Sequence, residues 1–331
     1  MAPGWRWRLA LILLLTLATG CSRWASRTDL PAWPLHADTV VFPFEWKALR
    51  FGAAVSPHGA MMVPVRLPGM PAEVHLQLDL GSRRSMLYTA FWERWAADFA
   101  GPRETLVQDD VGRYLPDQSL MLGAARIVVP RLWLRNRQTS RPAAGGDALF
   151  PEAVGTLGTD LLGARALVID YPGRTLRLLA QLPAVWDARL HWVPMQVRDG
   201  RYFVQMKVQG RSRRLIFDTG SSAFALLTST REWRRLARPG ALVERLSVPS
   251  WDDTLDVLRT ASDAGLAIGT LELPIGQVSC IPQLRWTLML ALWWLNVDGL
   301  IGNQAFLQHV VVLDPARGRF GVARPAELPS P

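Results

Sequence analysis

The chain has 331 residues, of which 49% are hydrophobic and 20% charged, and its formal net charge is +9. This length allows two lobes of roughly 100–150 residues, each with its own core, and the composition excludes both a disordered chain and a polytopic membrane protein. The arginines are scattered and no basic run is interleaved with aromatic residues, so we expect no nucleic-acid partner. Such diffuse charge suits a position near anionic surfaces.

The first twenty residues have the pattern of a targeting segment that lies outside the fold. Arg6 and Arg8 form a positively charged start, and an apolar stretch from Leu9 to Leu17 follows. This order is typical of a secretory signal peptide, and the stretch is too short to span a bilayer comfortably. We therefore expect residues 1–20 to be a signal peptide.

The segment ends in Ala18-Thr19-Gly20-Cys21, which resembles the lipobox of bacterial lipoproteins. Such a box has small residues that fit the signal peptidase and a cysteine whose sulfur takes the lipid. The resemblance implies that Cys21 is lipidated and that the membrane is a partner through this anchor. In that family a residue other than Asp at the position of Ser22 indicates a periplasmic lipoprotein of the bacterial cell envelope, sorted to the outer membrane. An ordinary cleaved signal with an incidental cysteine is the alternative.

The next segment and the cysteine count agree with a tethered protein. Residues 21–42 have no apolar period, so they are predicted to form a tether. The chain has two cysteines, Cys21 and Cys280, and acylation of the first would exclude a disulfide between them. Cys280 lies in an apolar stretch and is predicted to be a buried structural thiol.

After the tether the chain contains one pattern twice. In the first copy an alternating strand over 62–67 is followed by a Gly-containing turn and a second strand that ends at Asp79. In the second copy the strand covers 202–208 and the strand after the turn ends at Asp218. Short alternating runs with Gly or Pro between them are typical of β-hairpins.

The correspondence continues downstream in the same order. Each copy has an alternating pair of strands around a glycine, a Gly-x-x-Gly element, a strand that ends in Asp and a last strand after a basic turn: 120–134, 155–158, 168–170 and 174–178 in the first copy, and 266–278, 299–302, 311–314 and 317–322 in the second. Chance alternation could imitate one such match, but five in order indicate an internal duplication.

Most of the predicted elements are short strands, so the fold class is mainly β with a few short helices. Helices are expected at Ala90–Ala100 and Arg231–Ala237. The apolar segment 286–295 is too short to span a bilayer. It is expected to be a buried helix, with a surface that faces a membrane or a partner as the alternative.

The sequence Asp218-Thr219-Gly220-Ser221-Ser222, with apolar residues on both sides, resembles the catalytic loop of aspartic peptidases of the pepsin and retropepsin superfamily. In that family a hydrophobic-hydrophobic-Gly element crosses beneath each acid, and the elements ending in Gly158 and Gly302 match it. The resemblance covers about residues 45–325. It implies two pseudo-symmetric acid-protease-like β lobes, at 43–182 and 190–325.

The same resemblance implies a catalytic pair, Asp79 and Asp218, with one acid from each lobe. Two carboxyl groups a few ångströms apart do not both ionise, so they share one proton. The ionised member activates a water and the protonated member hydrogen-bonds the scissile carbonyl of a peptide or protein substrate. This chemistry, that of an aspartic endopeptidase, needs no cofactor and no metal.

The neighbours of the two acids are predicted to support them. Gly81 and Gly220 allow a tight turn beside each acid, and their amides are expected to hold the carboxylates. By family analogy the Thr219 hydroxyl reaches across to the opposite lobe. Two serines, Ser82 and Ser221, complete the supporting set; neither lies in the Gly-x-Ser-x-Gly elbow of a serine hydrolase.

The first copy departs from the family pattern. Leu80 stands where the family has Thr or Ser, so it cannot make the reciprocal hydrogen bond, which is worth about 1 kcal/mol. Arg83 and Arg84 follow the loop, and a guanidinium turned inward would stabilise the ionised acid; both are expected to point to solvent. The alternative function is therefore a catalytically inactive pseudo-protease that binds peptide or envelope polymer.

Other site types have little support in the sequence. The five histidines fit no triad order, and no His, Cys or acid spacing indicates a metal. Tyr114, in a predicted turn, could belong to a hairpin that closes over a substrate. The connector at 180–190 is short, so the two lobes are expected to pair within one chain as a monomer, whereas a homodimer of like lobes is the alternative.

Overall fold

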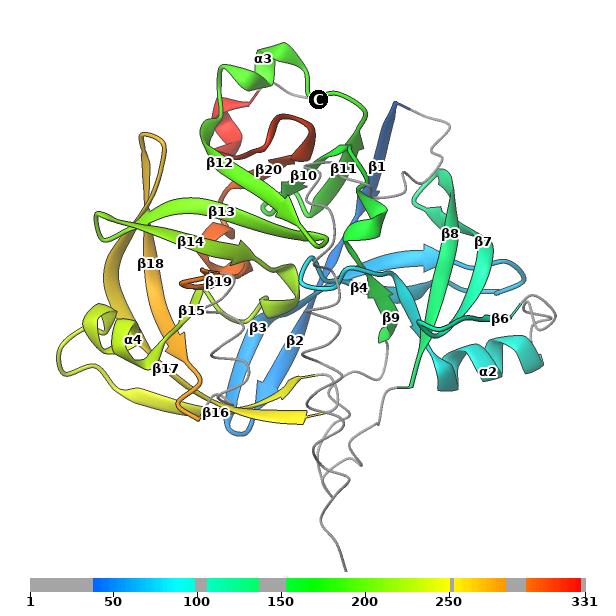
Figure 1. Ribbon diagram of the computed structural model, residues 1–331, viewed down its shortest axis with the longest axis horizontal. Helices are drawn as coiled ribbons and strands as arrows, with labels where there is room; N and C mark the ends of the chain where they lie inside the picture. Colours follow the sequence, from blue (N-terminus) through cyan, green and yellow to red (C-terminus); the bar gives the residue numbers. More distant parts are fainter. Residues whose placement is uncertain (1–37, 99–105, 137–152, 251–252, 284–295, 329–331) are drawn as a thin grey trace, which may run out of the picture.

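The computed structural model describes residues 38–98, 106–136, 153–250, 253–283 and 296–328. These residues are mainly β-structure, arranged as two lobes joined by a central sheet. In Figure 1 the first lobe lies on the right, the second on the left, and the central sheet above them. The predicted class, mainly β with two lobes and a few short helices, is confirmed.

The first lobe is an eight-stranded sheet in the order β2-β3-β4-β9-β5-β8-β7-β6. Alternating apolar residues turn one face of its strands toward the core, as in β7, where the side chains of Leu120 and Leu122 are fully buried. Its elements are β2 (Glu45–Phe51), β3 (Ala54–Arg66), β4 (Val74–Leu78), β5 (Met86–Tyr88), α2 (Thr89–Asp98), β6 (Val107–Gln108), β7 (Arg113–Leu122), β8 (Ala125–Arg135), β9 (Ala153–Leu157) and the short 3-10 helix η1 (Thr159–Leu161).

The second lobe repeats this arrangement with longer hairpins. Its strands follow the order β13-β14-β19-β15-β18-β17-β16. Its elements are β13 (Arg201–Val208), β14 (Arg211–Phe217), η2 (Thr219–Ser221), β15 (Leu226–Thr228), α4 (Thr230–Leu236), β16 (Val243–Ser250), β17 (Asp253–Ile268), β18 (Leu271–Cys280), β19 (Gly299–Ile301) and η3 (Asn303–Phe306).

The central sheet is built from both halves of the chain, in the order β1-β11-β10-β20-β21-β12. The halves meet where β10 runs antiparallel to β20, with Val168 opposite Val312. The sheet continues into the second lobe through β12, which pairs with β13. Its elements are β1 (Thr39–Pro43), β10 (Ala166–Asp170), β11 (Thr175–Leu179), α3 (Ala184–Asp187), β12 (His191–Arg198), β20 (Val310–Asp314), η4 (Pro315–Arg317), β21 (Arg319–Ala323) and η5 (Pro325–Glu327).

The first strand corrects the predicted end of the tether. Residues 39–42, assigned to the tether from the sequence, belong to β1, which pairs with β11 in the register Thr39 to Leu179. The side chains of Val40 and Phe42 are buried in the core. Two apolar residues at alternate positions are too short a pattern to distinguish an edge strand from a linker.

The duplication is visible at equivalent turns and strands. Gly123, between β7 and β8, has a φ of 57°, and Gly269, between β17 and β18, has a φ of 58°. The strand before each acid runs parallel to the strand of the Gly-x-x-Gly element, β4 with β9 and β14 with β19. The repeat predicted from the sequence is therefore one fold formed twice.

The predicted helices are confirmed where the structure describes them. The helix expected at 90–100 is α2, and the one expected at 231–237 is α4. Helix α4 begins after Ser229, whose hydroxyl accepts a hydrogen bond from the amide of Glu232 at 3.2 Å. The segment 286–295 lies outside the described residues, as do the predicted signal peptide and Cys21. Cys280 is fully buried, as expected.

None of the helices in the ranges given above is long and apolar enough to cross a membrane.

Candidate active site

Each predicted acid follows the last residue of a strand and is held by the turn after it. Asp79 follows β4, and its Oδ1 accepts hydrogen bonds from the amides of Gly81 at 2.9 Å and Ser82 at 3.1 Å. Asp218 follows β14, and its Oδ1 accepts a hydrogen bond from the amide of Gly220 at 2.8 Å. Its Oδ2 accepts a second one, from the hydroxyl of Ser221, at 2.7 Å. Both loops therefore fix a carboxylate with their own donors.

The two acid loops face each other between the lobes. A Cβ atom placed on Gly81 would lie 2.6 Å from Oδ1 of Asp218, and one placed on Gly220 would lie 2.6 Å from Cγ of Asp79. Real Cβ atoms do not come this close to their neighbours, so each loop requires glycine because the opposite carboxyl group occupies the space of a side chain. The structure therefore brings Asp79 and Asp218 together.

The contact between the acids changes the protonation of Asp79. Its pKa is raised to about 8, first because burial penalises the charged form and next because the charge of Asp218 lies beside it. A hydrogen bond with the Asp218 carboxyl raises this pKa further, whereas the amides of Gly81 and Ser82 lower it. Asp79 is thus a carboxylic acid that retains its proton at neutral pH.

Thr219 links the two loops. Its hydroxyl accepts a hydrogen bond from the amide of Leu80 at 2.9 Å and donates one to the carbonyl of Leu78 at 2.9 Å. The side chain is fully buried, so both bonds are shielded from water. The reach across the lobes that the resemblance implies is present.

The Gly-x-x-Gly elements pass beneath the acids in both lobes. The amide of Asp79 donates to the carbonyl of Leu157 and that of Asp218 to the carbonyl of Ile301, each at 3.0 Å. A Cβ atom on Gly158 would lie 2.5 Å from the backbone of Arg84. A Cβ atom on Gly302 would overlap the backbone of the loop that follows Asp218. These glycines allow the two chain segments to touch.

The loop of the first lobe differs from that of the second at two positions. Leu80 turns its side chain into the hydrophobic core, where it is fully buried, so Thr219 is the residue whose side chain bonds across. The Ser82 hydroxyl donates to the carbonyl of Arg84 at 3.0 Å, whereas its counterpart Ser221 donates to Asp218.

The arginines after Asp79 are only half solvated, which corrects the expectation that they point to solvent. The guanidinium of Arg84 lies 4.1 Å from the centre of the Trp133 ring. Arg83 forms an ion pair with Asp199, in the turn between β12 and β13 of the second half. Sequence reasoning placed these side chains in water because it could not foresee the partners.

Sequence reasoning also missed Arg201, the first residue of β13. Its side chain is 31% exposed and lies 3.3 Å from Asp199. Burial lowers its pKa, and the charges of both Asp218 and Asp79 raise it, so this guanidinium is within electrostatic reach of the acid pair. Nothing in the local sequence distinguishes it from the other arginines of the chain.

A buried polar group next to the Asp79 loop was missed as well. The Ser85 hydroxyl donates to Asp160 at 2.6 Å and accepts from the amide of Gly158 at 3.0 Å. Burial raises the pKa of Asp160 to about 6. The crossing element of the second lobe carries Asn303, whose side-chain oxygen accepts a hydrogen bond from the Tyr171 hydroxyl at 2.8 Å. These contacts fasten the crossing element of each lobe.

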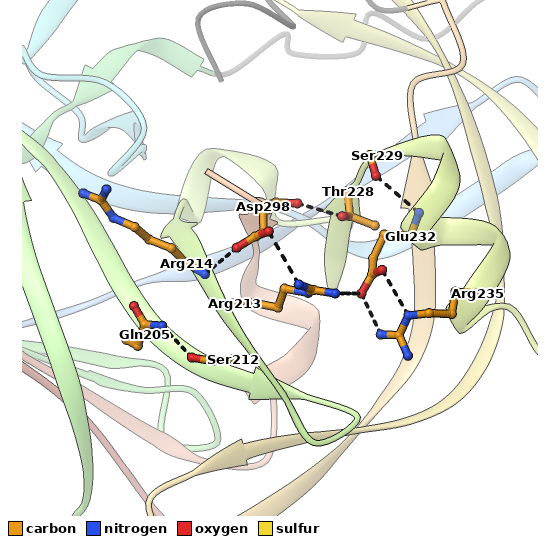
Figure 2. Close-up of polar contacts among 9 residues, drawn as sticks. All are labelled: Gln205, Ser212, Arg213, Arg214, Thr228, Ser229, Glu232, Arg235 and Asp298. Carbon is orange, nitrogen blue, oxygen red and sulfur yellow. Dashed lines mark hydrogen bonds and ion pairs between the residues drawn. The ribbon is translucent and has the colours of Figure 1, made fainter. Parts of the chain in front are cut away.

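A polar cluster braces the strand that leads to Asp218 (Figure 2). Arg213 of β14 lies 2.8 Å from Glu232 of α4 and 3.8 Å from Asp298, just before β19. Arg235 approaches Glu232 at 2.6 Å, and the hydrogen bonds of these arginines lower the pKa of Glu232 to about 2. The strand, the helix and the crossing element of this lobe are thus held by one ionic group.

Two hairpins lie next to the acid loops. In the first lobe Tyr114 is the second residue of β7, and the centre of its ring lies 5.1 Å from that of Trp133. In the second lobe, residues of the β16–β17 hairpin pack in one cluster with Phe51 and Phe224, whose rings stack 6.3 Å apart. That the hairpin of Tyr114 closes over a substrate stays a prediction.

Within the part of the chain that the structure describes, no group of three or more His, Cys, Asp and Glu side chains could hold a metal ion.

Of the comparisons of this chain with family models, curated proteins and solved structures, the last finds matches. No family model matches it, and no curated protein matches it. Among solved structures, the crystal structure of basic 7S globulin from soybean is similar, with a TM-score of 0.43 and 10% sequence identity over 88% of this chain and 95% of that one.

Proposed function

We propose that the protein is an aspartic endopeptidase that hydrolyses peptide bonds with a water activated between Asp79 and Asp218. The observation that supports this most is the approach of the two carboxyl groups, each across the glycine of the opposite loop. Loops from two copies of one fold meet there, and the proton that Asp79 keeps at neutral pH supplies the acid half of an acid–base pair.

The environments of the two acids favour different roles. Asp218 accepts hydrogen bonds at both oxygens, from Gly220 and Ser221, and such donors stabilise an ionised carboxylate. Asp79 holds the shared proton because it is buried next to that charge.

The chemistry follows from these roles. Asp218 removes a proton from water as the water oxygen attacks the carbonyl carbon, while Asp79 hydrogen-bonds the carbonyl oxygen and gives it a proton. The resulting tetrahedral diol collapses when its C–N bond breaks. The amine nitrogen takes the proton from Asp218, and a hydroxyl proton returns to Asp79, so the pair is restored.

The test is cleavage of an unfolded protein by the purified protein at mildly acidic pH. Asp79→Asn and Asp218→Asn are each expected to reduce the rate at least about 1000-fold, because loss of one member removes acid or base catalysis, and a statine-type peptide is expected to inhibit the parent. A parent that cleaves nothing, or an Asp79→Asn variant with full activity, would contradict the proposal.

A second candidate function is supported by Leu80. Because its side chain is buried in the core and makes no reciprocal bond, the pair could be held too loosely for hydrolysis while the cleft still binds peptide or envelope polymer. This candidate predicts peptide binding that survives both Asp→Asn changes. If the natural protein cleaves nothing and the Leu80→Thr variant cleaves peptides, the natural chain is a binding protein of this kind.

The place of action is proposed from the first residues of the chain. We infer that the protein is a periplasmic lipoprotein of the bacterial outer membrane, anchored through Cys21, because Ala18-Thr19-Gly20-Cys21 follows a signal-like segment. Incorporation of labelled palmitate into the parent and not into Cys21→Ala would support this, and equal labelling would contradict it.

A further inference from the structure

Arg201 stands opposite Asp218 in the second lobe. Strands β13 and β14 are antiparallel with Tyr202 opposite Phe217, so the residue before Tyr202 lies next to the residue after Phe217. Cross-strand neighbours point to the same face of a sheet. The hairpin register therefore places Arg201 next to Asp218, and the guanidinium is within electrostatic reach of both acids.

The turn before Arg201 contacts the loop that follows Asp79. Gly200 has a φ of 67°, and a Cβ placed on it would lie 3.2 Å from both Cγ of Arg83 and Oγ1 of Thr159. Asp199, in the same turn, pairs with Arg83 through one oxygen and with Arg201 through the other. Arg201 is thus held at the seam of the two lobes, close to both acid loops.

The charged groups around the acid pair are unequal in number. Arg201 and Arg83 share the single carboxylate of Asp199. On the other side of the Asp79 loop, Asp160 is bonded to Ser85, and Arg84 rests on the ring of Trp133. The Asp199 side chain is 52% exposed, so water weakens its effect more than that of Arg201. Among these groups, Arg201 is the one whose charge is coupled to both acids.

We propose that Arg201 is a positioning residue that moves the pH range in which the Asp79–Asp218 pair carries one charge to lower pH, and that Asp199 limits its effect. A cation near two coupled acids stabilises each ionised state, so both of their ionisation steps move to lower pH. This offsets the burial that favours the protonated form of Asp79. The inference rests on the proposed function, for which one charge on the pair is the working state.

The test is the pH dependence of kcat/KM for cleavage of an unfolded protein. Arg201→Gln is expected to move both limbs of the profile up by about one pH unit, because a stabilising cation is lost. Asp199→Asn is expected to move them down, because Arg201 is then unopposed. Arg201→Lys keeps the charge, so its pH midpoints are expected to stay near those of the parent. The control Arg211→Gln, at the far end of the same hairpin, is also expected to keep the parent's midpoints.

The pH midpoints are expected to rise in Arg201→Gln and to fall in Asp199→Asn. Shifts in opposite directions distinguish an electrostatic role from a structural one. Loss of activity in Arg201→Gln and Asp199→Asn with unchanged midpoints, or shifts in the same direction, would overturn the inference.

A second readout does not need activity. If the parent cleaves nothing, the proposed function fails, and the inference is then decided by titrating the Asp79 and Asp218 carboxyl carbons by NMR in the parent, Arg201→Gln and Asp199→Asn. Upward and downward shifts, respectively, support it, and unshifted titrations overturn it.

Discussion

The two acid loops are copies of one structure, yet the second holds its acid more completely than the first. Asp218 has hydrogen bonds at both carboxylate oxygens, including one from the Ser221 hydroxyl. Asp79 has amide donors to one oxygen, and the hydroxyl of Ser82 bonds to the backbone instead. The difference lies in the donors of the two loops, which reach both oxygens of Asp218 and one oxygen of Asp79.

The strands that lead to the acids differ in the same sense. Strand β14 is braced by the partly buried ionic group of Arg213, Glu232 and Asp298 (Figure 2). On β4 the polar contact is between His75 and Glu45, 3.6 Å apart and mostly exposed on the Glu45 side. The hydroxyl that bonds across to the Asp79 loop, that of Thr219, also comes from the second lobe. We infer that the second lobe is the firmer frame, on which the Asp79 loop is aligned.

Among changes that keep both acids, the largest expected effect comes from Gly81→Ala and Gly220→Ala, which place a methyl group against the opposite carboxyl. We expect each to lower the rate of peptide cleavage at least about 100-fold, because the acids must separate by a distance that geometry-dependent catalysis does not tolerate. The control is Gly52→Ala, where φ is 66° and no atom lies within 4 Å of the added carbon. A Gly81→Ala variant as active as that control would contradict the close approach of the acids.

Thr219→Val tests the unequal bridge between the lobes. It leaves the amide of Leu80 and the carbonyl of Leu78 without their buried partner, so we expect the free energy of unfolding to fall by about 1–3 kcal/mol. Denaturant unfolding measures this, and Thr219→Ser, which keeps the hydroxyl, is the matched control. Equal stability of Thr219→Val and the parent would show that the bridge contributes little.

Glu232→Gln tests the firmness of the second lobe without touching the acids. We expect a loss of about 2 kcal/mol at neutral pH with unchanged cleavage. Because the pKa of Glu232 is lowered from 4.5 to about 2, its contribution is present above pH 4.5 and is lost as the pH falls toward 2. The parent and the variant should therefore approach equal stability in acid, and a constant difference would exclude this ionic role.

Much of the site follows from local sequence. Asp79, Asp218 and the glycines beside them were identified because a strand that ends in an acid and a tight turn has a short-range pattern, and because the pattern occurs twice. Leu80 was likewise visible as a departure from that pattern.

The contacts that join the lobes did not follow from the sequence. Arg201 lies near the acids only because of the hairpin register and the turn at Asp199, which meets Arg83 of the other half. Asp160 meets Ser85 across the crossing element of the first lobe. Such pairs depend on how distant segments pack, and neither propensity nor alternation encodes them.

The central claim is that Asp79 and Asp218 form one coupled acid pair. The most direct measurement is the titration of the Asp79 side-chain carboxyl carbon by NMR, in the parent and in Asp218→Asn. We predict that Asp79 in the parent titrates near pH 8, and that its midpoint falls in the variant because the neighbouring charge has been removed. A midpoint near pH 4 in the parent, unchanged by Asp218→Asn, would contradict the claim.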